Sequence, residues 1–256
     1  MLIQPCHRSP ELRSSSKRSL RFSKTYGETV CCAGVTAEGI WKRLFPVRFR
    51  HLKGKSSFGR WDWVDFRYDR PKTDSRSESC HVYEDSITVG SKIGEAEKVA
   101  LLEPLIVGSG QAAASLGRSL ALIRPRNTRF IVKRRTLTQV EEQKQAFARA
   151  ARQTSFLDKE LAALEPSPFE FKFRFEDDAG LHEYVNADWE AHAMFYNGRR
   201  RQGEAETLRW MNGVFNEDYP RKGMVFAIGN QAKRPQVWQL LGVIRLDEAR
   251  QGALVF

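Results

Sequence analysis

The sequence predicts an α+β fold: a small antiparallel β-barrel, OB-like, in the N-terminal half, followed by a mixed α/β C-terminal half. Short apolar runs with glycine-bearing turns fill residues 26–89, which is typical of a small barrel. Apolar residues at helical spacing predict a long helix over about 138–164. The run FEFKFRFE at 169–176 alternates strictly between phenylalanine and charge, which indicates a half-buried strand.

The 256 residues divide into three predicted segments. Residues 1–23 are basic and serine-rich and predict a disordered arm, residues 24–135 a β-rich barrel-like domain, and residues 136–256 an α+β domain with a long helix and strands. The four cysteines show no C-x-x-C spacing, which favours a reducing cytoplasm. No apolar run is long enough to span a bilayer, so we expect a cytoplasmic protein without a membrane partner.

The barrel-like segment is expected to contain four strands. ETVCCAGVT at 28–36 and IWKRLFPVRFRHL at 40–52 predict a hairpin, and RWDWVDFRYDR at 60–70 and CHVYEDSITVG at 80–90 supply two more strands. In the second strand, period-two alternation places Trp41, Phe45, Val47 and Phe49 on one face. The other face then holds Lys42, Arg48 and Arg50. Pro46 predicts an edge or a bend there.

The remaining elements follow from periodicity and turn residues. We expect a helix at 94–106, a loop or short helix at 108–117, and two strands within 119–135 broken at Pro125. A second helix is expected from about 187 to 211, and two terminal strands at 223–230 and 237–246.

The net charge of +11 is concentrated near the N-terminus, because residues 1–76 contain 17 Lys and Arg against 7 Asp and Glu. This asymmetry predicts a polyanion partner, DNA or RNA, held through its phosphates without sequence readout. The predicted phosphate contacts are Lys42, Arg43, Arg48, Arg50, Lys53 and Lys55. Trp61 and Trp63 lie opposite Val64, Phe66 and Tyr68 on their strand, so we expect one of these rows to stack on bases.

Two other classes of function stay open. His182, Asp188, Glu190 and His192 in LHEYVNADWEAH could hold a divalent metal for phosphodiester hydrolysis. The simpler interpretation of that run is an Asp N-cap with solvated neighbours. We predict no resident metal or cofactor outside the hydrolase alternative. The third class is a scaffold whose basic face binds an acidic protein.

Four stretches, KTYGETVCCAGVTAEGIWKRLFPVRFR, LALIRPR, ADWE and FAIGNQAKRPQVWQLLGVI, resemble a family of uncharacterised bacterial proteins. The resemblance implies a cytosolic protein whose gene lies near DNA-handling, mobile-element or defence genes, and a role within a larger complex. Arg124, Pro125, Asp188 and Glu190 match its motifs, which adds Arg124 to the expected nucleic-acid contacts. The family pattern has cysteines just before the position of His182, where this chain reads EDDAG, so a zinc site is in doubt here.

Overall fold

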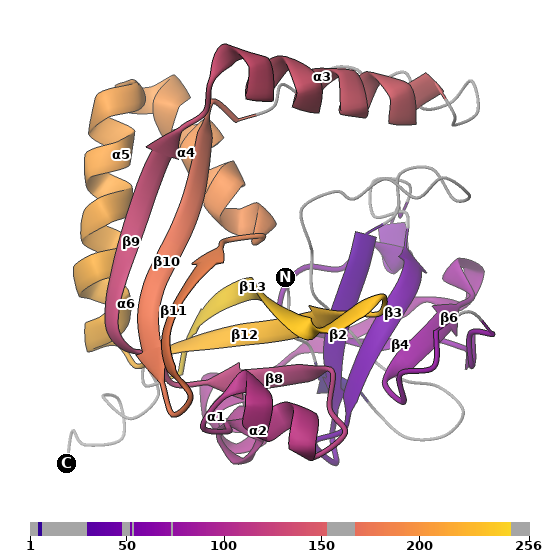
Figure 1. Ribbon diagram of the computed structural model, residues 1–256. Coiled ribbons are helices and arrows are strands. Elements are labelled where there is room, and N and C mark those ends of the chain that lie inside the picture. Colours follow the sequence, from indigo (N-terminus) through magenta and orange to yellow (C-terminus); the bar gives the residue numbers. More distant parts are fainter. Residues whose placement is uncertain are drawn as a thin grey trace.

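The structure is a computed structural model that describes residues 5–6, 30–47, 52, 54–72, 74–152 and 167–246 (Figure 1). It is a mixed α+β fold in which more residues are in strands than in helices. Its described strands form four open sheets, none of which closes into a barrel. Among the described residues, no helix combines the length and apolar composition that crossing a membrane requires.

The N-terminal sheet has the strand order β1-β2-β3-β6-β5. Its members are β1 Pro5–Cys6, β2 Val30–Thr36, β3 Trp41–Val47, β6 Ser79–Val82 and β5 Tyr68–Asp69. The predicted β2–β3 hairpin is confirmed, whereas β3 pairs with β6 in parallel, which a simple antiparallel meander does not allow. A second small sheet pairs β4 Asp62–Asp65 with β7 Thr88–Lys92. Short helical turns η1 Gly54–Ser56 and η2 Glu84–Ser86 connect these strands.

The central sheet is antiparallel, with the order β13-β12-β8. It contains β8 Leu120–Ile123, β12 Met224–Gln231 and β13 Arg234–Arg245, and the predicted terminal hairpin is confirmed as β12–β13. Alternate residues of β12 enter different cores: Phe226 and Ile228 point to one side, and Val225 and Ala227 to the other. The central sheet is therefore covered on both faces, which is why its strands are almost continuously apolar.

The third sheet has the order β11-β10-β9 and covers one side of the central sheet. Its strands are β9 Arg126–Arg134, β10 Phe169–Asp177 and β11 Gly180–Val185. The alternation predicted for 169–176 is confirmed, because Phe169, Phe171, Phe173 and Phe175 are all buried. They form the first core with Phe226 of β12 and with aromatic residues of the neighbouring helices.

Those helices are α4 Trp189–Gln202, α5 Glu204–Gly213, the π-helical turn η5 Val214–Asp218 and α6 Tyr219–Arg221. The single helix expected over 187–211 is broken at Gly203, whose φ of +83° only glycine adopts readily. The long predicted helix appears as α3 Leu137–Arg152, and the rest of its predicted range lies outside the described residues. Figure 1 shows α3 standing away from the central sheet.

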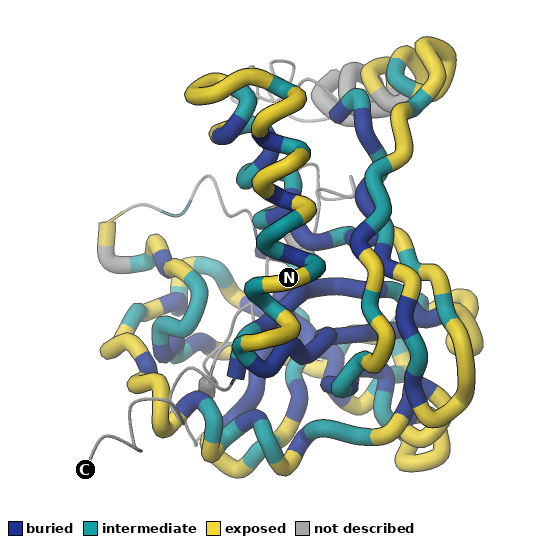
Figure 2. The backbone as a smooth tube through the Cα atoms, turned by 90° about the vertical axis from the view of Figure 1, so that its left-hand side faces the viewer, coloured by how far each residue is buried: buried dark blue, intermediate teal, exposed yellow. Residues whose placement is uncertain are grey.

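The second core joins the two halves of the sequence. On the N-terminal side it contains Val35 and Trp41, and on the C-terminal side apolar residues of the central sheet such as Leu122 and Val225. Its remaining wall is formed by α1 Glu95–Leu102 and η3 Glu103–Leu105, while α2 Gly110–Ser115 precedes β8. Figure 2 shows the resulting band of buried chain through the middle of the molecule. The predicted boundary between residues 135 and 136 stays a prediction.

The predicted alternation of β3 is wrong, because both faces of this strand are covered. Trp41 packs in the second core, whereas Leu44 and Val47 pack in a third core with the side chains of β4 and β6. Phe45 is only partly buried. The β2–β3 register shifts between Val30 and Cys32, and such a shift changes the face of the sheet on which the following side chains lie. β3 lies between β2 and β6, so the edge position suggested by Pro46 is also wrong.

The predicted disordered arm lies outside the described residues except for Pro5 and Cys6, which pair with Val35 and Thr36 of β2.

Candidate nucleic-acid interface

Two arginines lie side by side on the outward face of the third sheet. Arg129 of β9 and Arg174 of β10 are directly opposed in the antiparallel register, and both side chains are exposed. Neither makes an ion pair with any residue in the described part of the chain. Like charges directly opposite each other on a sheet repel and destabilise it. An anion held between them would relieve that repulsion, so this pair is the clearest anion-binding feature among the described residues.

More cations lie further along β9 from this pair. Lys133 shares the outward face with Arg129 and lies roughly 13 Å away, at about 3.3 Å per residue. Lys133, Arg134 and Arg135 line a pocket of about 350 Å³ together with Gln139, Glu142 and Glu170. Arg134 is paired with Glu204 at 2.5 Å. Burial lowers the pKa of Arg135, which also donates to the Ser167 carbonyl at 2.9 Å.

The same pocket lies beside the first turn of α3. The Thr136 hydroxyl accepts a hydrogen bond from the Gln139 backbone N–H at 3.2 Å, and the Gln139 side-chain oxygen accepts from the Thr136 N–H at 3.0 Å. This reciprocal capping starts the helix directly after the cations of β9. A helix N-terminus favours anions through its free N–H groups and dipole. The geometry therefore adds to the positive potential that the side chains create.

Acidic residues limit the extent of this face. Lys172 donates to Glu183 at 3.0 Å and lies 3.4 Å from Glu170, and these contacts, the Glu183 hydrogen bond first, raise its pKa. Arg126 is paired with Asp178 at 2.8 Å. The outward-facing cations of this sheet that make no ion pair among the described residues are thus Arg129, Arg174 and Lys133, although Arg174 lies opposite Glu183 and Lys133 opposite Glu170 in the strand registers. They form a short row rather than a broad basic surface. We call these three residues the β9–β10 cationic row.

The structure places the predicted N-terminal contacts in different environments. Lys42 is half-buried, with its ammonium 5.5 Å from the Tyr68 ring. Arg48, Arg50 and Lys53 lie outside the described residues, and only the backbone of Lys55 is described. The prediction for these four cations therefore stays a prediction.

Arg43 does not lie on the surface, because only 4% of it is exposed. Its guanidinium donates to the Ser119 hydroxyl at 2.9 Å, to the Ser119 carbonyl at 2.5 Å and to the Asn230 carbonyl at 3.3 Å. Glu78 accepts from the Ser119 N–H and hydroxyl at 2.6 and 2.9 Å. Arg43 therefore connects β3 to the central sheet, and we remove it from the phosphate contacts.

Arg76 adds a second connection to the same carbonyl. It donates to the Asn230 carbonyl at 3.0 Å and to both carboxylate oxygens of Asp74. Despite the opposing effect of burial, the hydrogen bonds from Arg76 and Ser79 lower the pKa of Asp74 to about 2. Asp74 therefore keeps its charge, and with it the Arg76 contact, at any ordinary pH.

Neither tryptophan of the predicted stacking row is free to receive a base. Trp63 is 5% exposed, and Val64 and Phe66 on the opposite face are buried as well. Trp61 is half-buried, with the Arg60 guanidinium 5.6 Å and the Lys98 ammonium 5.0 Å from its ring. Arg124 is paired with Glu103 at 2.6 Å, next to α1 rather than on the β9–β10 cationic row.

Asp188 and Glu190 hold an arginine from the other half of the sequence. Arg60 forms an ion pair with Glu190, lies 3.9 Å from the Asp188 carboxylate, and donates to the Val243 carbonyl at 3.4 Å. Asp188 caps α4 by accepting from the Glu190 N–H at 3.1 Å. It also accepts from the Val243 N–H at 3.3 Å. The Asp N-cap of the simpler interpretation is confirmed, but its neighbours are not simply solvated, because Glu190 is paired with Arg60 and His192 is largely buried.

The two histidines of the hydrolase alternative lie on different elements. His182 of β11 contacts Asp177 at 2.8 Å and packs on the Phe175 ring. His192 of α4 packs on the Phe171 ring, and burial, aided by the charge of Arg135, lowers its pKa from 6.5 to about 4. No group of three or more His, Cys, Asp or Glu side chains among the described residues is arranged to hold a metal. The geometry therefore gives the hydrolase alternative no support.

Sequence reasoning missed the β9–β10 cationic row, although one signal for it was present. Residues 124–135 contain six Lys and Arg and no acidic residue. Counting charge over long segments hid this run, because the C-terminal two thirds of the chain are almost neutral. The pairing with Arg174 was not visible at all, since it depends on the β9–β10 register.

The fold and the charged face define an α+β protein of open, stacked sheets. Family comparison divides the chain between two models: residues 17–106 match the Domain of unknown function (DUF8758), and residues 107–255 match the Domain of unknown function (DUF8757). The chain belongs to the DUF8757 family, whose model covers more than half of it. No curated protein and no solved structure gives a significant match to this chain.

Proposed function

We propose that this protein binds nucleic acid through its phosphate backbone, and that the β9–β10 cationic row is the centre of the contact. On this proposal Arg129 and Arg174 bind one phosphate between them, and Lys133 binds a phosphate further along the strand. The protein would act as a nucleic-acid-binding subunit of a bacterial DNA-handling or defence complex.

The observation that carries the proposal is the direct opposition of Arg129 and Arg174, neither of which makes an ion pair with a described residue. Arg174 also lies opposite Glu183 of β11, but the Glu183 carboxylate is paired with Lys172, another outward-facing cation of this sheet, which also contacts Glu170. An edge strand also gains from charge, because charge prevents pairing with another chain. That explanation accounts for cations on β9, which is an edge strand, but not for Arg174 on the central strand β10.

The overall charge supports the same partner. The net charge of +11 and pI of about 9.7 favour association with polyanions. Lys42, Arg48, Arg50, Lys53 and Lys55 would extend the contact as a second part of the path. Because Trp63 is buried and Trp61 is engaged with Arg60 and Lys98, we expect phosphate contacts rather than base stacking by this predicted row, and little sequence preference.

The test is fluorescence anisotropy with labelled single-stranded DNA, duplex DNA and RNA, each titrated across salt concentrations. A polyanion site gives a linear fall of log affinity with log salt, about −0.7 to −0.9 per phosphate neutralised. We expect Arg129→Glu with Arg174→Glu to reduce this slope by roughly two contacts and to weaken binding more than ten-fold.

Two further double variants locate the contact. Arg48→Glu with Arg50→Glu tests the N-terminal path, and Lys72→Glu with Lys92→Glu is the matched control. The control makes the same charge change at two exposed residues that are not among the proposed contacts. An equal loss of affinity in all three double variants would mean that binding depends only on net charge. This result would contradict the proposed binding face.

A competing polyanion, poly-L-glutamate, distinguishes nucleic-acid binding from the scaffold alternative. Poly-L-glutamate carries charge without the phosphate spacing of a nucleic acid. If it binds more tightly than all three nucleic acids at the same salt concentration, the partner is an acidic protein. If the nucleic acids do not bind folded wild-type protein at low salt, the proposal fails.

A further inference from the structure

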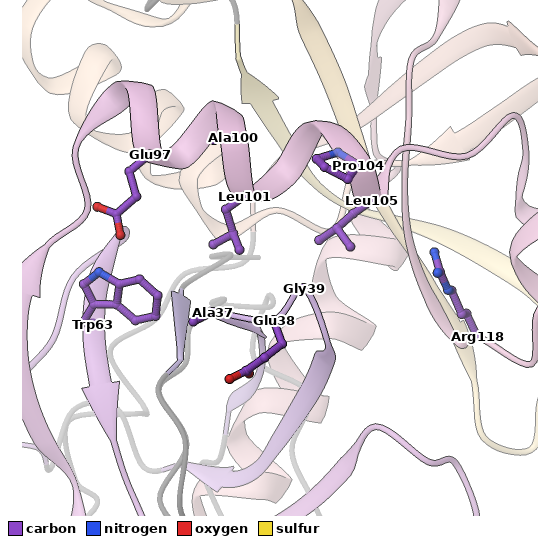
Figure 3. Close-up of a pocket in the computed structure, with 10 residues that line it drawn as sticks. All are labelled: Ala37, Glu38, Gly39, Trp63, Glu97, Ala100, Leu101, Pro104, Leu105 and Arg118. Atoms are coloured by element: carbon purple, nitrogen blue, oxygen red, sulfur yellow. The ribbon is translucent and has the colours of Figure 1, made fainter.

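A groove opens on a different part of the molecule, between the β2–β3 turn and α1 (Figure 3). Its volume is about 600 Å³. It is lined by three residues of the turn, by one face of α1 and η3, by Trp63 of β4 and by one arginine before β8: Ala37, Glu38, Gly39, Trp63, Glu97, Ala100, Leu101, Pro104, Leu105 and Arg118. The groove thus joins elements from both sides of the second core.

The wall of the groove that α1 and η3 form is apolar in the middle, and Glu38 of the β2–β3 turn lies across from it (Figure 3). Figure 3 shows the Leu101 and Leu105 side chains pointing from α1 and η3 toward the β2–β3 turn. Apolar exposure continues beyond the groove: Ile40, directly after Gly39, is 54% exposed, and Leu116, two residues before Arg118, is 61% exposed. Exposed apolar side chains grouped around a concave surface are a mark of protein interaction sites.

The two ends of the groove carry opposite charges. Glu97 lies with Trp63 at one end and Arg118 lies at the other, with the two leucines between them (Figure 3). The side chains of Glu97 and Arg118 make no ion pair or hydrogen bond with any residue that the structure describes. A ligand with a cation at one end, an apolar centre and an anion at the other would therefore match both the shape and the charge.

We propose that this groove binds an apolar segment of a partner protein, with a Lys or Arg of that segment beside Glu97 and an Asp or Glu beside Arg118. A protein segment is favoured over a small molecule because Ile40 and Leu116 extend the apolar surface past the groove. A nucleic acid is disfavoured here, since Glu97 and Glu38 repel phosphates. The site is therefore separate from the β9–β10 cationic row and does not depend on the proposed nucleic-acid function.

The first test uses blocked peptides, so that only side chains carry charge. Acetyl-Lys-Leu-Leu-Glu-amide is titrated into the full-length protein while the indole N–H signal of Trp63 is followed by NMR and assigned with Trp63→Phe. We expect the signal to shift, and the affinity to exceed that of acetyl-Gln-Leu-Leu-Gln-amide by at least ten-fold. Equal affinity for both peptides, or no shift with either, overturns the proposal.

The second test reverses one charge of the groove. Glu97→Lys makes both ends cationic, so this variant should prefer acetyl-Glu-Leu-Leu-Glu-amide over the Lys-bearing peptide by a similar factor. Asp85→Lys makes the same charge change at an exposed residue outside the groove and should keep the wild-type preference. An unchanged preference in Glu97→Lys, with the fold verified by circular dichroism, contradicts the assignment of the charged ends.

A third peptide tests whether the groove binds free short peptides instead of a segment of a partner protein. Free Leu-Leu-Leu carries its charges on its termini, as a short free peptide would. If it binds and the blocked Lys-bearing peptide does not, the groove takes free peptides and the assignment to a partner protein is wrong.

Discussion

Arg60 and Glu190 form an ion pair across the two halves of the sequence, 130 residues apart. The contact is anchored by Asp188, which is buried, caps α4 and lies 3.9 Å from the same guanidinium. The acidic residues of ADWE therefore hold the segment before β4 against the start of α4. The carboxylates of Asp188 and Glu190 are directed at an arginine. They form no metal site with other described residues.

We expect Arg60→Met to lower the free energy of unfolding by about 1–3 kcal/mol, because it leaves the buried Asp188 without its nearest cation. Urea denaturation followed by circular dichroism measures this change. Glu190→Gln should cost less, about 1 kcal/mol or below, because Glu190 is partly exposed and solvent screens its pair. If the double variant lowers the free energy of unfolding by the sum of the two single changes, Arg60 and Glu190 are not coupled.

The buried guanidinium of Arg43 predicts a larger effect. Arg43→Met removes three hydrogen bonds to Ser119 and Asn230, so that their buried carbonyls lose the Arg43 donor. We expect a loss of about 3 kcal/mol or more in unfolding free energy. Its neighbour Lys42 is the matched control: Lys42→Met, on a half-buried residue, should change stability by about 0.5 kcal/mol. Similar costs for both variants would contradict the structural role of Arg43.

His192 predicts a pH dependence of stability. Its pKa is about 4 in the folded protein because burial, with the nearby Arg135, disfavours the charged ring, whereas Asp188 acts in the opposite direction. The unfolded chain binds this proton near pH 6.5, so the contribution is fully present above pH 6.5 and is lost as pH falls toward 4. We expect a loss of about 3 kcal/mol across that window.

The measurement is the urea midpoint of wild type and His192→Gln at several pH values. The variant should show a flatter dependence between pH 6.5 and 4. Below pH 4 the two curves should fall together, because the unfolded chain then binds a proton at Asp74 near pH 3.8, whereas the contacts of the folded protein hold its pKa at about 2. Identical slopes in the upper window would rule out His192 as the titrating group.

Two glycines of the helical pair predict opposite results. A Cβ at Gly198 would lie 2.5 Å from a methyl carbon of Thr207, so Gly198→Ala should push α4 and α5 apart and cost about 1–3 kcal/mol. Gly213 has a helical φ of −60° and open space around it. Gly213→Ala should therefore raise stability by about 0.5–1 kcal/mol. Thermal unfolding of both variants checks the signs.

Sequence periodicity predicted the strands that have one covered face. The phenylalanines of β10 alternate because one side packs against helices and the other faces solvent. The same reasoning failed for β3, where Trp41 and Leu44 belong to different cores on opposite sides of the sheet. When both faces are covered, alternation no longer marks the outside. Arg43 shares the face of Trp41 by period two, so its assignment as a surface cation rested on its charge and went against the alternation.

The candidate interface was less predictable than the fold. Asp188 could be expected as a helix cap from its place before an apolar helical pattern. The opposition of Arg129 and Arg174 could not, because it arises from pairing between strands that are 45 residues apart in the sequence. Spacing along the chain shows which residues share a face of one strand, but it does not show what the neighbouring strand places beside them.

The shared second core has a consequence for synthesis on the ribosome. Val35, Trp41 and Leu105 are made well over 100 residues before their partners Val225, Leu241 and Ile244. At about 5–20 residues per second, the nascent chain waits on the order of ten seconds with these apolar side chains uncovered. During that interval the early segment is a target for chaperones, and the core closes only after the β12–β13 hairpin has emerged.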